Sequence, residues 1–175
     1  MREKAEILDA KAAARAMARI SYEILEKNKG IDNLCIIGIL SKGAYIAESL
    51  ARKIREVEGK EIEVGMLDIS SFRDDKKADP SEDRTNISFD VTNKKIVLVD
   101  DVVYTGRSTR AAIDAIMKRG RPLNIQLAVL IDRGHRELPI RADYVGKNLP
   151  TSSDEIVRVC IDENGLVERV IICGE

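Results

Sequence analysis

The sequence predicts a single α/β domain, residues 1–175, in which helices cover both faces of a mostly parallel central sheet. Apolar strand-like runs alternate with amphipathic helical segments along most of the chain. A chain of 175 residues with 44% hydrophobic residues can build one full core but is short for two. No internal repeat, low-complexity segment or linker divides the sequence.

The first half of the chain supplies two predicted helices and two predicted strands. Asp9 can cap a helix that runs to about Gly30. Its buried face is marked by apolar residues at helical spacing: Ala13, Met17, Ile20 and Ile24. "LCIIGI" (34–39) and "IEVGMLDIS" (62–70) are β-like runs. Between them, after "LSKG", a second helix has one apolar side: Ile46, Leu50, Ile54 and Val57.

The second half begins with a polar stretch, residues 72–86, which has almost no apolar residues and predicts a flexible flap. "KIVLVDD" (95–101) is the next strand, "RSTRAAIDAIMKRG" is a helix ending at Gly120, and "IQLAVLID" (125–132) is another strand. We expect the basic stretch 133–152 to be irregular. Two short strands, "EIVRVCI" and "LVERVII", close the chain around a turn at Asn164-Gly165.

Composition excludes several classes of function. The net charge of −1 gives no overall field that would draw the protein to nucleic acid or an anionic membrane, so any such contact must be a local patch. No apolar run approaches the roughly 20 residues of a membrane span, and the N-terminus has charges where a signal peptide is apolar, so we expect no membrane partner and a cytoplasmic location. The three cysteines have neither disulfide nor metal spacing, and His135 is the only histidine.

The strongest chemical signal is "DDVVYTGRST". Asp100 and Asp101 end a predicted buried strand, where unpaired charge is costly. The turn that follows offers hydroxyl groups, a glycine and the amide groups of a helix N-terminus, which together form an anion cradle. A ligand with a phosphate near a polyol fits both halves of the motif. The alternative is that the acids only cap a loop and that the turn only starts a helix.

The stretch "VLVDDVVYTGRST" resembles the phosphoribosyl pyrophosphate (PRPP) signature of the type I phosphoribosyltransferases. Nearly the whole chain, with residues 120–152 and "LDISSFRDD" as the clearest parts, resembles the bifunctional pyrimidine-operon attenuation regulators and uracil phosphoribosyltransferases. The resemblance implies a type I phosphoribosyltransferase-like fold with a flap (72–86) and a small base-binding hood (133–157). It also implies conversion of uracil and PRPP to UMP and pyrophosphate, Mg²⁺, UMP or UTP as effectors, and a homodimer or higher homo-oligomer.

The resemblance also assigns roles in the site. Asp100, Asp101, Lys42 and Arg73 are the implied catalytic residues. PRPP and UMP would contact Ser41, Lys42, Gly43, Asp100, Asp101, Tyr104, Thr105, Gly106, Arg107, Ser108 and Thr109. Mg²⁺ would be held mostly through substrate and water, so no dedicated protein ligand set is expected. Lys42 stands where the family generally has arginine, and a lysine offers a point charge in place of a planar fork. Lys42 as a solvated residue at a helix start is the alternative.

The regulatory role implied by the resemblance is binding to pyrimidine-operon leader mRNA, which promotes transcription termination when uridine nucleotide is bound. The expected RNA contacts are Arg15, Arg19, Tyr22, Arg136 and Arg141. Ala18 and Tyr22 replace the family's usual threonine and histidine. Two alternatives therefore stay open: a uracil phosphoribosyltransferase that has lost RNA recognition, and a nucleotide-sensing protein without turnover.

Overall fold

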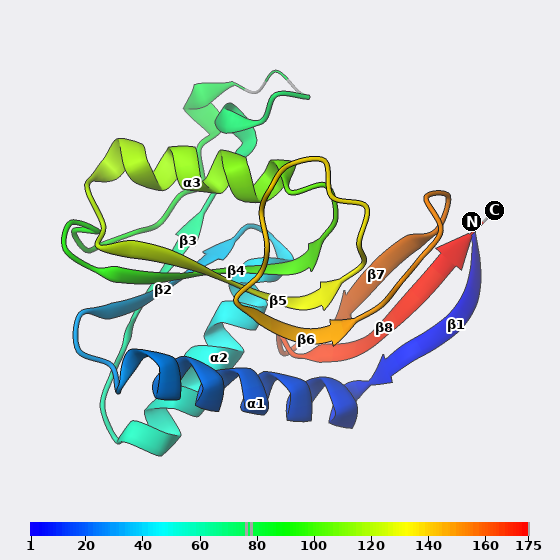
Figure 1. Ribbon diagram of the computed structural model, residues 1–175, viewed down its shortest axis with the longest axis horizontal. Helices are drawn as coiled ribbons and strands as arrows, with labels where there is room; N and C mark the ends of the chain where they lie inside the picture. Colours follow the sequence, from blue (N-terminus) through cyan, green and yellow to red (C-terminus); the bar gives the residue numbers. More distant parts are fainter. Residues whose placement is uncertain (76, 78, 175) are drawn as a thin grey trace.

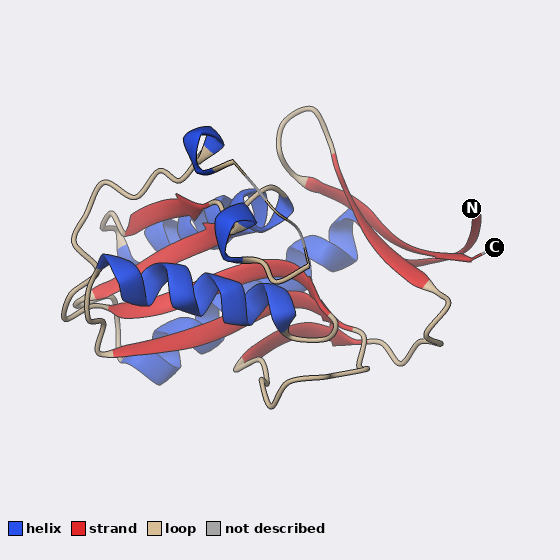
Figure 2. Cartoon of the chain, turned by 90° about the horizontal axis from the view of Figure 1, so that it is seen from above, coloured by secondary structure: helices blue, strands red, loops and turns tan. Residues whose placement is uncertain are grey.

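The computed structural model describes residues 1–75, 77 and 79–174. Its strands form two separate sheets, as Figures 1 and 2 show. The larger sheet is parallel throughout, with the order β3-β2-β4-β5-β6, and the smaller is antiparallel, with the order β1-β8-β7. The strands are β1 Arg2–Asp9, β2 Leu34–Ile39, β3 Glu63–Leu67, β4 Lys95–Val103, β5 Asn124–Asp132, β6 Tyr144–Asn148, β7 Ile156–Ile161 and β8 Val167–Gly174. The α-helices are α1 Ala10–Asn28, α2 Lys42–Glu58 and α3 Arg107–Arg119.

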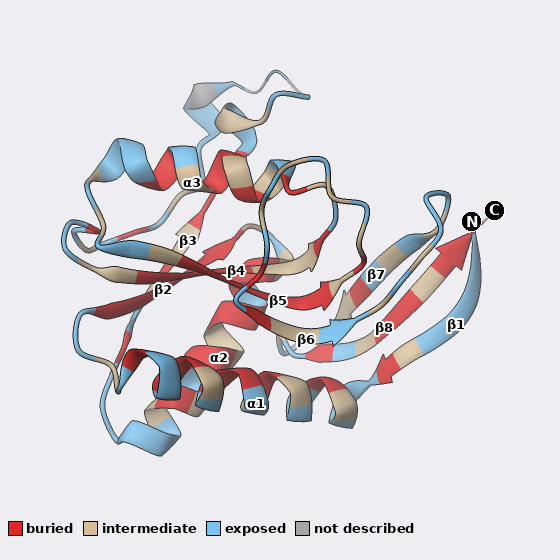
Figure 3. Cartoon of the chain, viewed as in Figure 1, coloured by how far each residue is buried: buried red, intermediate tan, exposed pale blue. Residues whose placement is uncertain are grey.

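Helices cover both faces of the parallel sheet, which confirms the predicted fold class. α1 and α2 pack on one face, while α3 packs on the other (Figure 1). Because both faces are covered, the central strands are apolar along most of their length, and all six residues of β2 are buried (Figure 3). Alternate side chains of β4 serve the two cores: Val97 and Val99 join the α1/α2 side, and Ile96 and Leu98 join the α3 side.

The two long N-terminal helices agree well with their sequence patterns. Asp9 caps α1, because its Oδ1 accepts a hydrogen bond of 2.8 Å from the Ala12 N–H. All four residues predicted for the buried face of α1 are buried. In α2 the predicted apolar side is buried through Ile54, but the prediction is wrong for Val57, which lies in the last turn and is 43% exposed.

The small sheet joins the two ends of the chain, and its first strand was not predicted. β7 and β8 form the expected hairpin, and Gly165 adopts the positive φ of 78° that its turn requires. β1 pairs with β8 but is exposed along most of its length, so its sequence carries little apolar signal (Figure 3). Leu8 is its one buried residue. Only the pairing with a strand more than 150 residues away makes this segment β.

The stretch predicted to be irregular, 133–152, contains a strand. β6 pairs in parallel with the second half of β5 and forms the edge of the large sheet. The expectation fails here because an edge strand needs no apolar run, and Lys147 and Asn148 are exposed. The region predicted to be the hood, 133–157, comprises a loop, β6, a second loop and the start of β7.

The flap stretch, 72–86, projects from the edge of the sheet beyond α3 (Figure 1). It is mostly exposed, with short 3₁₀ turns at Ser70–Phe72 and Pro80–Glu82, while residues 76 and 78 lie outside the described residues. Its far end returns to β3 through a two-way backbone pairing of Met66 with Asn86. In the described part of the chain, no helix is long and apolar enough to cross a membrane.

Candidate active site

Two adjoining clefts lie at the carboxyl ends of the parallel strands, where ligands of open α/β sheets bind. The first, of about 340 Å³, is lined by residues following β2 and β3 and by the acids of β4: Ser41, Lys42, Asp68, Ser70, Arg73, Arg84, Asp100, Asp101 and Ser108. The second, of about 310 Å³, is lined by the turn after β4: Tyr104, Thr105, Gly106, Arg107, Ser108 and Thr109. Four residues line both clefts: Arg73, Asp100, Val102 and Ser108. Segments far apart in sequence thus meet around one region.

The two acids are open to the cleft because β2 ends before β4 does. The last residue of β4 that pairs with β2 is Val99, whereas pairing with β5 continues to Val103. Asp100 and Asp101 therefore lie where β4 has lost its neighbour on one side. Asp100 Oδ1 accepts from the Asp101 N–H (2.9 Å), and Asp101 Oδ1 accepts from the Val102 N–H (2.8 Å).

The surroundings of Asp100 disfavour its charged form. Burial, followed by the negative charge and hydrogen bond of Asp101, raises the Asp100 pKa well above its usual value. Arg73 acts in the opposite direction, because its positive charge favours the carboxylate. A perturbed carboxyl at the floor of a cleft is typical of a ligand-binding site.

The segment Leu40–Gly43 lies directly against β4; it comprises the two-residue connection after β2 and the first two residues of α2, and is called the Lys42 loop. A side-chain Cβ at Gly43 would stand 2.5 Å from the Val99 carbonyl oxygen and 3.2 Å from the Asp100 Cα. Both are backbone atoms, so this approach requires glycine. The contact places the loop beside the two acids and gives Lys42 and Ser41 access to the same cleft.

The turn after β4, predicted to be an anion cradle, leads directly into the N-terminus of α3. Gly106 has a φ of 93° and precedes α3 without a side chain that could cap it. Amide groups in the first turn of α3 are thereby left for a ligand. Thr105 Oγ1 accepts a hydrogen bond of 3.2 Å from the Arg107 N–H, and Thr109 is only 2% exposed, so the cradle is tied into the fold.

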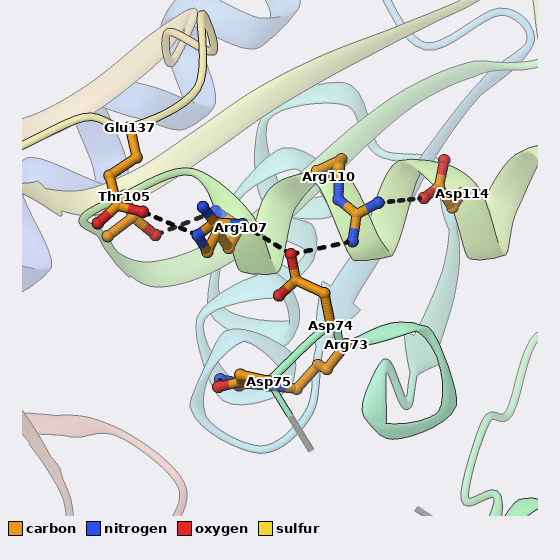
Figure 4. Close-up of polar contacts among 8 residues, drawn as sticks. All are labelled: Arg73, Asp74, Asp75, Thr105, Arg107, Arg110, Asp114 and Glu137. Carbon is orange, nitrogen blue, oxygen red and sulfur yellow. Dashed lines mark hydrogen bonds and ion pairs between the residues drawn. The ribbon is translucent and has the colours of Figure 1, made fainter. Parts of the chain in front are cut away.

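Carboxylates from two other segments hold the arginines of the site (Figure 4). Arg107 donates to Asp74 of the flap (2.7 Å) and to Glu137 of the loop before β6 (2.8 Å). Arg73 forms a two-bond pair of 2.7 and 2.6 Å with Asp75. These bonds raise the pKa of Arg107 and of Arg73. A phosphate that binds Arg107 therefore competes with two protein carboxylates.

The loop before β6 is braced against Tyr104. The Arg133 guanidinium carbon lies 4.1 Å from the Tyr104 ring centre, and its nitrogens donate to Thr151 Oγ1 and the Ser152 carbonyl. Arg136 donates to the Tyr104 carbonyl (2.7 Å) and to Asp132 (2.7 Å). Arg133 is 6% exposed. This buried side chain therefore holds Tyr104 in place beside the second cleft.

The predicted RNA contacts fall into two groups. Arg15 and Tyr22 are exposed on α1, and the Lys53 ammonium lies over the Tyr22 ring at 5.7 Å. Arg19 pairs with Glu23 and donates to the carbonyl groups of Val145 and Gly146 at 3.2 and 2.7 Å.

Arg136 and Arg141 form the second group, in the loop before β6. Arg141 is exposed, but Arg136 is engaged with Tyr104 and Asp132. Of the five predicted contacts, Arg19 and Arg136 thus also make internal bonds that hold β6 and the loop before it.

Sequence reasoning missed five charged residues near the clefts: Asp68, Asp74, Asp75, Arg84 and Glu137. Asp68 offered a signal, because it is an acid near the end of a β-like run, as Asp100 is. The other four lie in polar stretches where nothing in the sequence distinguishes them from solvated charges.

Comparison with known proteins places the chain among phosphoribosyltransferases. Residues 3–164 match the model of the phosphoribosyl transferase domain. The "Bifunctional protein PyrR" of Bacillus cereus (strain AH820) and that of Bacillus thuringiensis subsp. konkukian (strain 97-27) are each 56% identical to this chain, with 98% of both chains covered.

Solved structures show the same fold at low identity. A hypoxanthine-guanine phosphoribosyltransferase of Bacillus anthracis has a TM-score of 0.71 at 16% identity, with 98% of each chain covered. The hypoxanthine phosphoribosyltransferase of Trypanosoma cruzi, in complex with its product IMP, has a TM-score of 0.73 at 16% identity and covers 98% of this chain and 91% of its own.

Proposed function

Because this chain belongs to the phosphoribosyltransferase family, and within it to the bifunctional PyrR proteins, we propose that the two adjoining clefts are its site for PRPP, uracil and UMP. The protein is a uracil phosphoribosyltransferase and a regulator of pyrimidine operons, as its resemblance to that family predicted. The observation that carries the site assignment is the meeting of the β4 acids, the Gly106 turn and the Lys42 loop around one region.

Each part of the site suits one part of PRPP. The cradle from Thr105 to Thr109 binds the 5′-phosphate, since helix N-terminal amides and hydroxyl groups favour an anion. Asp100 and Asp101 accept hydrogen bonds from the ribose hydroxyls. Ser41, Lys42 and Gly43 receive the pyrophosphate, and Tyr104 and the braced loop before β6 lie beside the sugar and base.

The reaction breaks the bond from the anomeric carbon to pyrophosphate, which leaves with the bonding electron pair. It forms a bond from that carbon to a uracil nitrogen, which gives up its proton. Its transition state develops positive charge on the ribose ring and negative charge on the leaving oxygen. The protein therefore acts mainly by positioning and electrostatics. Asp100 and Asp101 favour the electron-poor ring, and Lys42 and Arg73 favour the leaving group. The flap that carries Arg73 excludes water when it closes.

Phosphoribosyltransferases of this family generally use Mg²⁺ with PRPP, and the site's donors suit such an ion. Among the described residues, no group of three or more His, Cys, Asp and Glu side chains could hold a metal by itself. Mg²⁺ commonly takes one or two carboxylates together with substrate phosphates and water. Asp100 and Asp101 would supply the carboxylates. When bound, the ion would neutralise part of the pyrophosphate charge.

For the regulatory role, we propose that leader mRNA contacts the exposed face of α1 and the loop before β6, through Arg15, Arg19, Tyr22, Arg136 and Arg141. UMP or UTP in the transferase site strengthens this binding, and by linkage RNA strengthens nucleotide binding equally. A homodimer or higher homo-oligomer would repeat this surface. The site of action is the cytoplasm, where the transcripts and substrates are found.

A second candidate, a transferase without RNA recognition, is favoured by one observation. Arg19 and Arg136 donate hydrogen bonds to carbonyl and carboxylate groups of the protein itself, which leaves fewer N–H groups for RNA phosphates.

One pair of assays tests both halves. Product formation from uracil, hypoxanthine and guanine is compared at equal PRPP, and labelled leader RNA is titrated with and without UMP. We expect turnover with uracil only and tighter RNA binding with UMP. Turnover without any RNA binding selects the second candidate, and RNA binding without turnover selects a nucleotide sensor.

A further inference from the structure

A second arginine of the flap stretch reaches the cleft that holds Lys42. Arg84 lies at the far end of the stretch, just before the backbone of residue 86 rejoins β3. Its side chain lines the cleft of about 340 Å³ together with Lys42 and both β4 acids. The side chain is 68% exposed, so a ligand in the cleft can reach the guanidinium group.

Asp68, directly after β3, fastens Arg84 in this place. Asp68 Oδ2 accepts from the Arg84 backbone N–H (3.2 Å) and from Arg84 Nε (3.4 Å). Asp68 Oδ1 accepts from the N–H (3.0 Å) and the hydroxyl (2.6 Å) of Ser70, which lies two residues before the flap begins. The Asp68 N–H donates to Thr85 Oγ1 at 3.0 Å. One carboxylate that is 7% exposed thus joins the far end of the flap to the residues just before its start.

Asp68 remains charged at neutral pH. Burial by itself would raise the pKa of Asp68, but the hydrogen bonds from Ser70 and Arg84 outweigh burial and lower it. The charged Asp68 carboxylate accepts four hydrogen bonds. One of them comes from Arg84 Nε, and this bond fixes the direction of the Arg84 side chain. Among the described residues, no oxygen atom takes up the two terminal nitrogens of Arg84.

The free end of Arg84 supplies what the loop after β2 lacks. The cation that this loop presents is Lys42, which offers a point charge and no planar fork. Pyrophosphate offers several anionic oxygens, and a guanidinium group binds two of them with matched geometry. On the basis of the proposed function, we propose that Arg84 binds the pyrophosphate end of PRPP and that Asp68 is its positioning residue.

The first experiment compares Arg84→Ala, Arg84→Lys and wild type in both reaction directions. For Arg84→Ala we expect KM for PRPP, and KM for pyrophosphate in the reverse reaction, to rise about tenfold or more, as for loss of a charged hydrogen bond. KM for uracil and the calorimetric affinity for UMP should stay within about twofold, because neither ligand contains pyrophosphate. Arg84→Lys should recover part of the loss, since it restores the charge without the fork.

Arg55→Ala is the matched control. Arg55 also forms one Nε ion pair, with Glu61 at 2.7 Å, and its side chain is 40% exposed, but it lies in the last turn of α2. Its removal should leave every kinetic constant unchanged. The proposal is overturned if Arg84→Ala leaves both pyrophosphate-dependent KM values unchanged, or if KM for uracil rises equally. Wild-type protein without turnover on uracil and PRPP would instead overturn the proposed function.

The positioning role is tested by Asp68→Asn alone and combined with Arg84→Ala. If Asp68 acts through Arg84, Asp68→Asn raises KM for PRPP in the wild-type background and has little further effect in the Arg84→Ala background. Equal effects in both backgrounds would refute the positioning role. If Asp68→Asn does not fold, Ser70→Ala, which removes only one donor to Asp68, replaces it in the same cycle and is judged by the same criterion.

Discussion

The close contact between Gly43 and β4 predicts a large functional effect from one methyl group. In Gly43→Ala the new Cβ would stand 2.5 Å from the Val99 carbonyl oxygen, whereas ordinary contact begins near 3.4 Å, so the loop must retreat by about 0.9 Å. Overpacking of this kind costs about 1–3 kcal/mol of unfolding free energy. For a chain of this size, that lowers Tm by roughly 2–4 °C per kcal/mol.

The kinetic effect should exceed the effect on stability. Displacement of a binding group by about 1 Å can lower turnover on the order of 100-fold, and the displaced loop carries Lys42. We therefore expect kcat/KM for PRPP to fall about 100-fold in initial-rate assays of UMP formation. UMP affinity, measured by calorimetry, should change little, because UMP leaves the pyrophosphate position empty.

Gly59→Ala separates loss of stability from displacement of the loop. Gly59 has a φ of 66° with nothing within 4 Å of the built Cβ, so alanine there strains the backbone by about 1 kcal/mol without a clash. It lies at the other end of α2 and should lower Tm with kcat/KM unchanged. If Gly43→Ala retains kcat/KM for PRPP within twofold, or if Gly59→Ala loses as much, the argument from the loop fails.

Three further predictions concern charge. Burial and a neighbouring acid raise the Asp100 pKa, so the charged carboxylate destabilises the fold at any pH above its ordinary pKa. Asp100→Asn should therefore raise Tm at pH 7 while it lowers turnover about 100-fold or more. An unchanged or lower Tm would contradict this. The lowered pKa of Asp68 stabilises the fold above about pH 4 and ceases to do so as pH falls through the folded-state pKa. The stability deficit of Asp68→Asn in urea unfolding should therefore shrink from pH 7 to pH 3, and a deficit independent of pH would refute it. Arg19→Ala removes two hydrogen bonds to β6 carbonyl groups, so it should lower RNA affinity and also lower the free energy of unfolding by about 1 kcal/mol. Arg15→Ala should lower RNA affinity alone. Equal unfolding curves for the two variants would count against the internal role of Arg19.

Local patterns predicted most of the elements that build the core. Asp9 caps α1 as expected, and the apolar runs of β2, β4 and β5 are buried between helices. Such segments can be recognised in the sequence because their apolar residues follow a regular pattern. The pattern has a period of 3.6 residues in a helix and is a continuous run in a strand covered on both faces. β1 and β6 escaped prediction because each is an exposed or edge strand whose conformation depends on backbone pairing with a partner distant in sequence.

The sequence by itself brought together the residues of the proposed ribose and phosphate positions, because Asp100, Asp101 and the Gly106 turn are contiguous and their order implies their placement at a strand end. Only the tertiary structure decided which other charges join them. Asp68 and Arg84 are 16 residues apart and meet through the return of the flap to β3, while Asp74 and Glu137 meet on Arg107 from opposite sides of the chain's midpoint. Ion pairs of this kind depend on distance in space, which sequence spacing does not encode outside a helix or a turn.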